Sequence, residues 1–182
     1  MESHKKQTVH GIGILIIIFG ILFCFLFWIL ILHPGIFIVG ILVVIFAVLF
    51  HLLRGIYIRY LWERKWAGEG KRVLIVYSRS PNWKEYIESK WIEQLGSHLV
   101  ILDWSDRSKW TKPFSLEVKA FKYWGGARAF NPIAILFPKR GRVRVIRFWN
   151  PFRDYRHGKI YNLQKAEDKL FTFVNNAGST AA

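Results

Sequence analysis

Basic side chains interleaved with aromatic rings are the clearest chemical feature of this sequence. They gather between positions 139 and 159 of a chain that carries a net charge of +15. Guanidinium and ammonium groups bind phosphates and carboxylates, and aromatic rings anchor such surfaces to their partners. The pattern predicts contact with anionic lipid headgroups, with an acidic protein surface or, less favoured, with single-stranded nucleic acid. The residues expected to make this contact are Lys139, Arg140, Arg142, Arg144, Arg147, Trp149, Arg153 and Arg156.

The chain lacks the residues that most catalytic chemistries require. The one cysteine, Cys24, lies in an apolar run, which excludes thiol nucleophiles and cysteine-ligated zinc from the polar part of the chain. No glycine-rich phosphate loop is present. Asp103, Asp106 and Asp154 lack the close spacing of metal ligands, and no nucleophile stands beside a base. We therefore expect no catalytic residue, no metal, no cofactor and no enzymatic activity.

Two apolar segments precede this polar part and determine where it can work. Positions 11–53 contain no Lys, Arg, Asp or Glu, and only the sequence His33-Pro34-Gly35 interrupts them with a turn signal. Each apolar run approaches or exceeds the ~20 residues that a helix needs to cross about 30 Å of hydrocarbon. The sequence therefore predicts transmembrane helices over 11–33 and 36–57, and the short connection makes them an antiparallel hairpin.

Two other interpretations of the apolar segments are less favoured. A cleaved signal peptide has a shorter apolar stretch, followed by a small-residue cleavage pattern that is missing here. A helical hairpin on the surface of a soluble protein would have a polar face along each helix, whereas both runs are apolar on all sides.

The distribution of basic residues predicts the orientation of the hairpin. Lys5 and Lys6 precede the first run, and Arg54 begins a basic stretch after the second, whereas the turn has neither Lys nor Arg. The positive-inside rule then places both termini in the cytoplasm, including residues 1–10. An integral protein of a bacterial inner membrane fits this arrangement.

Aromatic residues follow the second run and predict an interfacial belt. Such rings concentrate at the depth of the headgroups, so we expect an interfacial segment and linker over 58–70. The residues expected in the belt are Tyr57, Tyr60, Trp62 and Trp66.

The remainder of the chain, 71–175, has the pattern of a small α/β domain. Short β-branched runs predict buried strands, amphipathic spacing predicts helices, and the segment 150–161 is polar enough to predict a loop. The expected order is β-α-β-α-β-β-α, followed by a flexible tail over 176–182. The predicted strands are 72–77, 99–102, 133–137 and 142–148, and the predicted helices are 81–95, 116–124 and 163–174 with Asn162 as cap. In the last strand Arg142, Arg144 and Arg147 alternate with apolar residues, which predicts one solvated face.

This order of elements resembles the thioredoxin fold. Pro132 stands directly before the third predicted strand, where that superfamily keeps a cis-proline. The segment 132–143 is similar to the family's proline, apolar strand, basic glycine turn and return strand. Thioredoxins carry Cys-x-x-Cys where the first helix begins, and this chain has Ser78-Arg79-Ser80-Pro81 there. The resemblance therefore implies the scaffold without disulfide exchange.

The same resemblance implies a candidate ligand site. Relatives similar to glutathione transferases use a Ser, Tyr or Cys near this position, so Ser78 or Ser80 would hydrogen-bond a thiolate beside Arg79. Asn131 and Pro132 would stand where the superfamily pairs with peptide backbone. The alternative is that Ser80 only caps a helix.

Together these features predict a non-catalytic, membrane-anchored accessory subunit of a larger membrane protein complex. The expected partners are membrane lipid, other integral membrane subunits, and anionic headgroups or an acidic protein surface. Trp104 and Trp110 fall in a predicted loop, which favours a surface that is covered in the working state. A thiol-binding membrane enzyme that uses Ser78 or Ser80 is the alternative, as is a module for anionic lipid or nucleic acid.

Overall fold

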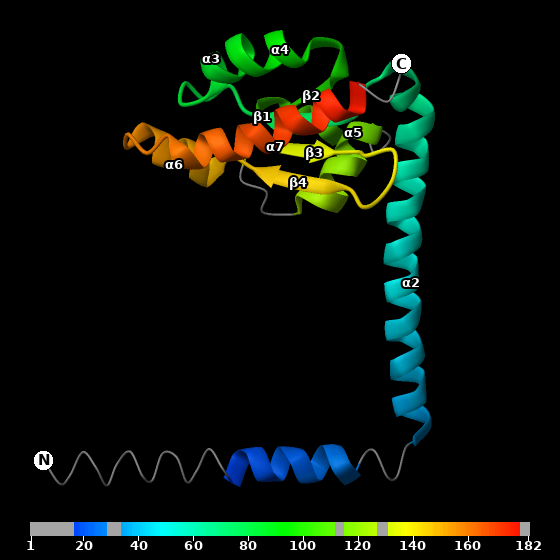
Figure 1. Ribbon diagram of the computed structural model, residues 1–182. Helices are drawn as coiled ribbons and strands as arrows, with labels where there is room; N and C mark the ends of the chain where they lie inside the picture. The colour runs from blue at the N-terminus through cyan, green and yellow to red at the C-terminus, as the bar shows by residue number, and fades with distance from the viewer. Residues whose placement is uncertain (1–16, 29–33, 112–114, 127–130, 179–182) are drawn as a thin grey trace, which may run out of the picture. The chain divides into compact units, whose positions relative to one another are not determined.

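The computed structural model describes residues 17–28, 34–111, 115–126 and 131–178 (Figure 1). Contacts divide the chain into two units, Met1–Leu53 and Arg54–Ala182. Residues 1–10, which the sequence places in the cytoplasm, and residues 179–182 of the predicted tail lie outside the described residues.

Helix α2 runs from Pro34 to Lys65. Among the described residues it is the one helix long and apolar enough to cross a membrane, with a mean hydropathy of 3.1 in its most apolar stretch. It begins at Pro34, two residues before the predicted start, because the fixed φ and missing N–H of proline suit a first helical turn. Residues 34 and 35 are thus helical and not part of the predicted turn, and His33 lies outside the described residues.

The first predicted membrane helix is described only in part. Ile17–Trp28 is an apolar helix, and its described length falls short of a membrane span. The flanking positions 11–16 and 29–33 lie outside the described residues, so the hairpin stays a prediction.

Four strands form one mixed sheet in the second unit, in the order β2-β1-β3-β4. β1 and β2 are parallel, whereas β3 is antiparallel to both β1 and β4. All four predicted strands are confirmed, with small shifts at their ends. Their bounds are β1 Val73–Tyr77, β2 Leu99–Asp103, β3 Ile133–Leu136 and β4 Arg144–Arg147.

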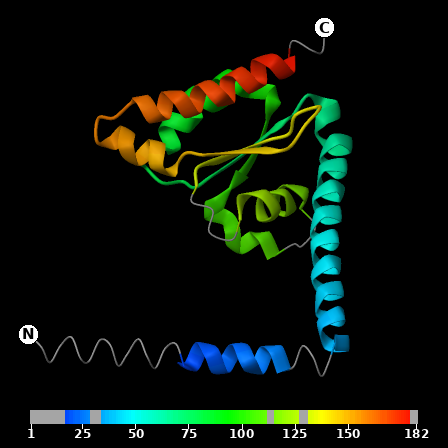
Figure 2. The same cartoon turned by 60° about the horizontal axis from the view of Figure 1, so that its bottom comes forward.

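Helices cover both faces of this sheet. Figure 2 shows α7 (orange to red) on one side and α5 (light green) on the other. Alternate residues of β1 divide between two cores, with Val73 and Ile75 in the first and Leu74 and Val76 in the second. A strand that is buried on both faces has a continuous apolar sequence. This is why the sequence predicts the bounds of β1 to within one residue.

The helical elements follow the predicted order with four additions. These are α6 (Trp149–Arg156) and the 3-10 helices η1 (Ala67–Glu69), η3 (Gly96–His98) and η4 (Trp104–Thr111). Trp104 and Trp110 therefore lie in a helical segment and not in the predicted loop. A continuous helical segment comprises α3 (Lys84–Tyr86), η2 (Ile87–Ile92) and α4 (Glu93–Leu95). It packs with α6 (Trp149–Arg156) and α7 (Tyr161–Gly178) against the first core. The second core is covered by α5 (Leu116–Ala120), η5 (Phe121–Gly125), η4 (Trp104–Thr111) and the end of α2.

Helix α6 replaces part of the loop predicted over 150–161. Phe152 is buried in the first core, where its ring lies 5.7 Å from that of Trp91. Pro151 lies in the first turn of α6, where its missing N–H costs no hydrogen bond. The predicted cap at Asn162 is also wrong, because α7 begins at Tyr161 and the Asn162 side-chain amide donates to Asp154 instead.

The last turns of α2 belong to the second unit and enter its core. Ile58 and Trp62 are buried, and the Trp62 ring stacks on Phe137 with ring centroids 4.0 Å apart. The indole Nε1 of Trp62 donates to the carbonyl of Lys71 at 3.2 Å. The prediction that Trp62 joins an interfacial aromatic belt is therefore wrong, whereas Tyr57 and Tyr60 are exposed. The segment 58–70, predicted as interface and linker, supplies core residues to the domain.

Candidate functional site

The register of β1 and β3 brings the two halves of the predicted ligand site to the same end of the sheet. Val76 of β1 pairs with Ile133 of β3, so β1 ends beside the start of β3. Ser78, Arg79 and Ser80 follow β1 directly, and the segment 131–132 directly precedes β3. The peptide between Asn131 and Pro132 is cis, and both residues are buried.

The two serines shape the turn before the first helical segment. The Ser78 carbonyl accepts a hydrogen bond from Trp83 Nε1 at 3.1 Å. The Ser80 Oγ accepts from the Asn82 N–H at 3.4 Å, and the Ser80 carbonyl accepts from the Lys84 N–H at 3.0 Å. The helix begins at Lys84, so the prediction of a helix that starts at Pro81 with Ser80 as its cap is wrong.

Arg79 is held by the segment that follows β2. Its guanidinium contacts Asp103 at 2.7 Å and Asp106 at 2.9 Å, and its backbone N–H donates to Ser105 Oγ. The Arg79 side chain is 58% exposed, so these ion pairs contribute little stability. Asp103 and Asp106 thus hold an arginine, and among the described residues no group of three His, Cys, Asp or Glu side chains is arranged to hold a metal ion.

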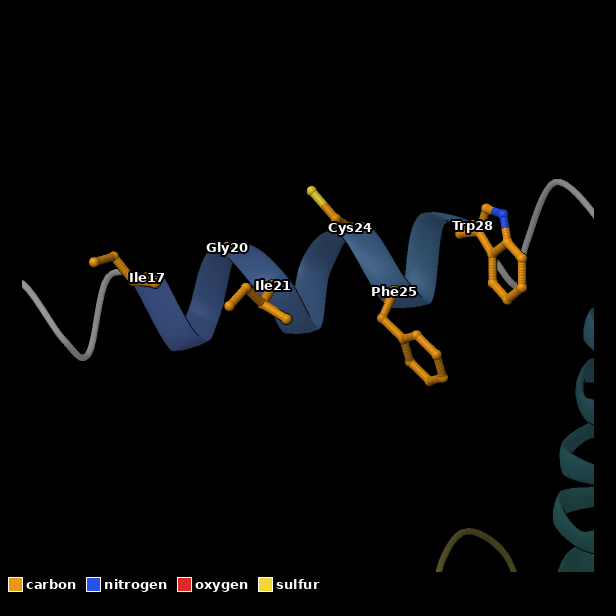
Figure 3. Close-up of a pocket in the computed structure, with 6 residues that line it drawn as sticks. All are labelled: Ile17, Gly20, Ile21, Cys24, Phe25 and Trp28. Carbon is orange, nitrogen blue, oxygen red and sulfur yellow. The ribbon is translucent and has the colours of Figure 1, made fainter.

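Four of the surface clefts in the described part of the chain are lined by none of the predicted ligand residues. One lies along the helix Ile17–Trp28, where Ile21 and Phe25 project to one side and Cys24 to the other (Figure 3). Another, of about 630 Å³, lies on the domain. It is lined by Pro138, Lys139, Arg140, Arg144, Thr172, Phe173, Asn176 and Ala177.

The residues predicted to contact anions fall into two groups at opposite ends of β4. Lys139, Arg140 and Arg142 lie in the β3–β4 turn, and Arg144 is the first residue of β4. The second group lies at and beyond the other end of the strand and comprises Arg147, Trp149, Arg153 and Arg156. The sequence predicts that these residues form one surface, whereas the structure places them in two groups at opposite ends of β4.

Members of the second group are engaged with the domain itself. Trp149 is half-buried and packs edge-on against Trp83, with ring centroids 5.5 Å apart. The Arg147 guanidinium donates to the Gly125 carbonyl, Arg153 lies 3.7 Å from Asp154, and Arg156 donates to Asn82. These contacts make the second group the weaker candidate for a partner surface.

Strand β4 does not have the solvated face that its sequence predicts. Val145 packs against the second core and Ile146 against the first, so each face is half-buried. The arginines are exposed because they stand at the ends of an edge strand.

A buried carboxylate that the sequence does not single out joins α7 to η2. Glu167 is 3% exposed, and its two oxygens accept hydrogen bonds from Trp91 Nε1 at 2.7 Å and from Lys90 Nζ at 2.9 Å. Lys90 Nζ also donates to the Tyr86 hydroxyl at 2.7 Å. Burial raises the pKa of Tyr86. Burial alone would lower the pKa of Lys90, but the hydrogen bonds to Tyr86 and Glu167 outweigh it and raise that pKa.

Tyr77 lies at the end of β1, beside the predicted ligand residues. Its hydroxyl donates to Glu88 at 3.1 Å. Burial, together with the hydrogen bond and the charge of Glu88, raises the pKa of Tyr77 to about 12. The phenol therefore stays protonated at neutral pH and ties the helical segment to the sheet.

A second set of polar contacts fastens the end of α2 to the domain. The Glu117 carboxylate accepts hydrogen bonds from Lys65 at 3.0 Å, from Trp66 Nε1 at 2.8 Å and from Ser115 Oγ. Burial alone would raise the pKa of Glu117. The hydrogen bonds from Ser115 Oγ, from the Glu117 backbone N–H and from Lys65, together with the positive charge of Lys65, outweigh burial and lower the pKa. Gly55 adds a close approach, because a Cβ there would lie 2.4 Å from the Tyr123 hydroxyl.

A comparison with known proteins finds no matching family, no matching curated sequence and no matching solved structure. Any function must therefore be inferred from the residues and contacts of this chain. They define a small α/β domain whose core includes the end of a long apolar helix.

Proposed function

We propose that this protein is a non-catalytic, membrane-anchored accessory subunit of a larger membrane protein complex. In this proposal α2 and the helix that contains Ile17–Trp28 form a two-helix membrane hairpin, and the domain from Arg54 onward lies in the cytoplasm. The length and hydropathy of α2 support the anchor, and the basic residues that follow the apolar run support the orientation.

The observation that supports this proposal most strongly is that one helix, α2, contains the apolar run and also supplies core residues to the domain. Ile58 and Trp62 of this helix are core residues of the domain, and Arg59 donates to backbone carbonyls of the β3–β4 turn. A domain whose core includes the end of its anchor stays close to the bilayer. It can therefore contact the cytoplasmic surface of a neighbouring subunit while the apolar helices contact that subunit within the membrane.

We assign a redox-inactive, thioredoxin-like arrangement to the domain. The order of its strands and helices, the β3–β4 hairpin and the position of Pro132 directly before β3 support this assignment. At the position of the family's two cysteines the chain has Ser78-Arg79-Ser80-Pro81, so the scaffold would serve binding and not thiol exchange.

The thiol-ligand alternative has less support from the geometry. Arg79 is held by Asp103 and Asp106, and Ser80 is engaged in the turn that precedes α3. A ligand at this edge of the sheet would have to displace those contacts before it could bind.

Purification in a mild detergent tests the proposed function. We expect the protein to elute with other integral membrane proteins in a complex of fixed stoichiometry, because the exposed apolar helices and the basic domain both offer contacts. Size-exclusion chromatography followed by mass spectrometry measures this. Chemical cross-linking in the intact membrane before solubilisation controls for a complex that the detergent dissociates. Recovery as a free monomer in both preparations would contradict the proposal.

A further inference from the structure

We propose that the β3–β4 turn and the edge strand β4 form a binding surface for anionic phospholipid headgroups. This inference rests on the membrane anchor of the proposed function. It adds which side of the domain meets the lipid, and which chemistry that side recognises.

Contacts along the end of α2 identify the part of the sheet that lies nearest to Arg54, the first residue of the second unit. Arg59 donates to the carbonyls of Pro138 and Gly141 in the β3–β4 turn, which lies beside α2 in Figure 1. One turn further along the helix, Trp62 stacks on Phe137, the residue after β3. The β3–β4 hairpin therefore meets α2 closer to Arg54 than the rest of the sheet does.

The remaining strands meet α2 further from Arg54. Glu63 pairs with Arg72, which immediately precedes β1, and Trp66 lines a cleft with residues 99–102 of β2. Neighbouring strands lie about 4.8 Å apart, and a helix rises about 1.5 Å per residue. The strands are thus stacked along residues 54–65 of the helix, with β4 nearest to Arg54 and β2 farthest from it.

The length of α2 places the turn at the depth of the headgroups. Arg54 is the first charged residue after the apolar run, and Arg59 follows it by five positions, or about 7.5 Å of helix. Each headgroup region is roughly 5–8 Å thick, which is half the difference between the whole bilayer and its hydrocarbon core. A turn bound to Arg59 therefore lies within or just outside the headgroups.

The charge of this edge matches an anionic lipid surface. The segment 138–149 contains five basic residues and no acidic one. Arg140, Arg142 and Arg144 are exposed, and no acidic side chain in the described part of the chain forms an ion pair with them. Arg140 and Arg144 also line the cleft of about 630 Å³ beside the end of α7. Their position at headgroup depth favours lipid phosphates over an acidic protein.

Hydrogen exchange of the full-length protein in lipid nanodiscs tests this inference. The protein is placed in discs of phosphatidylcholine alone and in discs that also contain phosphatidylglycerol. We expect the amides of 139–147 to exchange more slowly in the anionic discs, because β4 is an edge strand whose outward N–H groups are open to solvent without lipid. High salt should remove the difference.

A matched pair of variants separates this surface from general positive charge. Replacing Arg140, Arg142 and Arg144 with Gln should abolish the added protection, since each cation near an anionic surface contributes a factor of about five. Replacing Arg153, Arg156 and Lys159 with Gln removes the same number of charges at the other end of β4, and should leave the protection in place.

The outcomes distinguish this inference from the proposed function. Equal exchange in the two kinds of disc, for a protein that remains inserted in both, would overturn the headgroup surface while leaving the anchor intact. Protection that appears only in native membranes, and not in anionic discs, would identify an acidic protein as the contact and would equally overturn it.

Discussion

Replacing Trp62 with alanine is expected to lower the free energy of unfolding of the domain by about 3–5 kcal/mol. The side chain is fully buried, stacks on Phe137 at 4.0 Å and donates its N–H to the Lys71 carbonyl. Its removal leaves a large cavity between α2 and the sheet, together with a carbonyl that loses its donor. Because whole domains are stable by roughly 5–15 kcal/mol, this one change would unfold a large fraction of the molecules under mild denaturant.

Denaturant unfolding of the protein in detergent micelles, followed by circular dichroism, measures the effect. Tyr60→Ala on the same helix is the matched control, because Tyr60 is exposed and its loss should change stability by less than about 0.5 kcal/mol. Trp62→Phe should fall between the two, since it keeps an aromatic ring against Phe137 but loses the hydrogen bond to Lys71. A stability of Trp62→Ala equal to that of the Tyr60 control would mean that the domain folds without the end of α2.

Removal of the buried carboxylate of Glu167 is the second change with a large expected effect. Glu167→Ala leaves Trp91 Nε1 without an acceptor and Lys90 without its counter-charge. We expect a loss of about 2–4 kcal/mol, below the usual cost of breaking a fully buried pair, because the Lys90 side chain is 40% exposed and can turn toward water. The same denaturant titration measures this loss.

Two further variants show whether the loss comes from the unpaired partners. Asp168→Ala changes an exposed neighbour on α7 and should be nearly neutral. Replacing both members of the pair, as Lys90→Met with Glu167→Leu, should recover part of the stability, since an apolar pair carries no desolvation cost. A double variant as unstable as Glu167→Ala would show that the unpaired Trp91 N–H or the packing around α7, and not the unpaired charge of Lys90, sets the cost.

Strands β1 and β3 were predictable because burial on both faces leaves a continuous apolar run in the sequence. Val73 and Ile75 enter one core while Leu74 and Val76 enter the other, so β1 is apolar throughout and bounded by polar residues. Helix α6 was not predictable in the same way. It is eight residues long and Phe152 is its one buried side chain, too few positions to establish a helical repeat.

The end of α2 shows a different limit of sequence analysis. Rings such as Trp62 suit the headgroup region and a protein core equally well, so composition cannot distinguish the two. The spacing of Gly55, Ile58 and Trp62 does place them on one face of a helix, and that face is the one in contact with the domain. This spacing was the available signal for a buried face within the predicted linker.

The candidate sites could be predicted in part. The register places the segments 78–80 and 131–132 at one edge of the sheet, as the family resemblance implies. The ion pairs of Arg79 with Asp103 and Asp106 depend on the loop after β2, which carries no local signal for them. The burial of Glu167 could not be predicted, because a single acidic residue in an amphipathic helix is normally solvated.

Alkaline extraction of isolated membranes, followed by a high-speed spin, shows whether α2 spans a membrane with the domain at its end. We expect the full-length protein to stay in the membrane pellet after the alkaline wash and to enter the supernatant only when detergent is added. Recovery of the folded full-length protein in the supernatant without detergent would contradict this expectation.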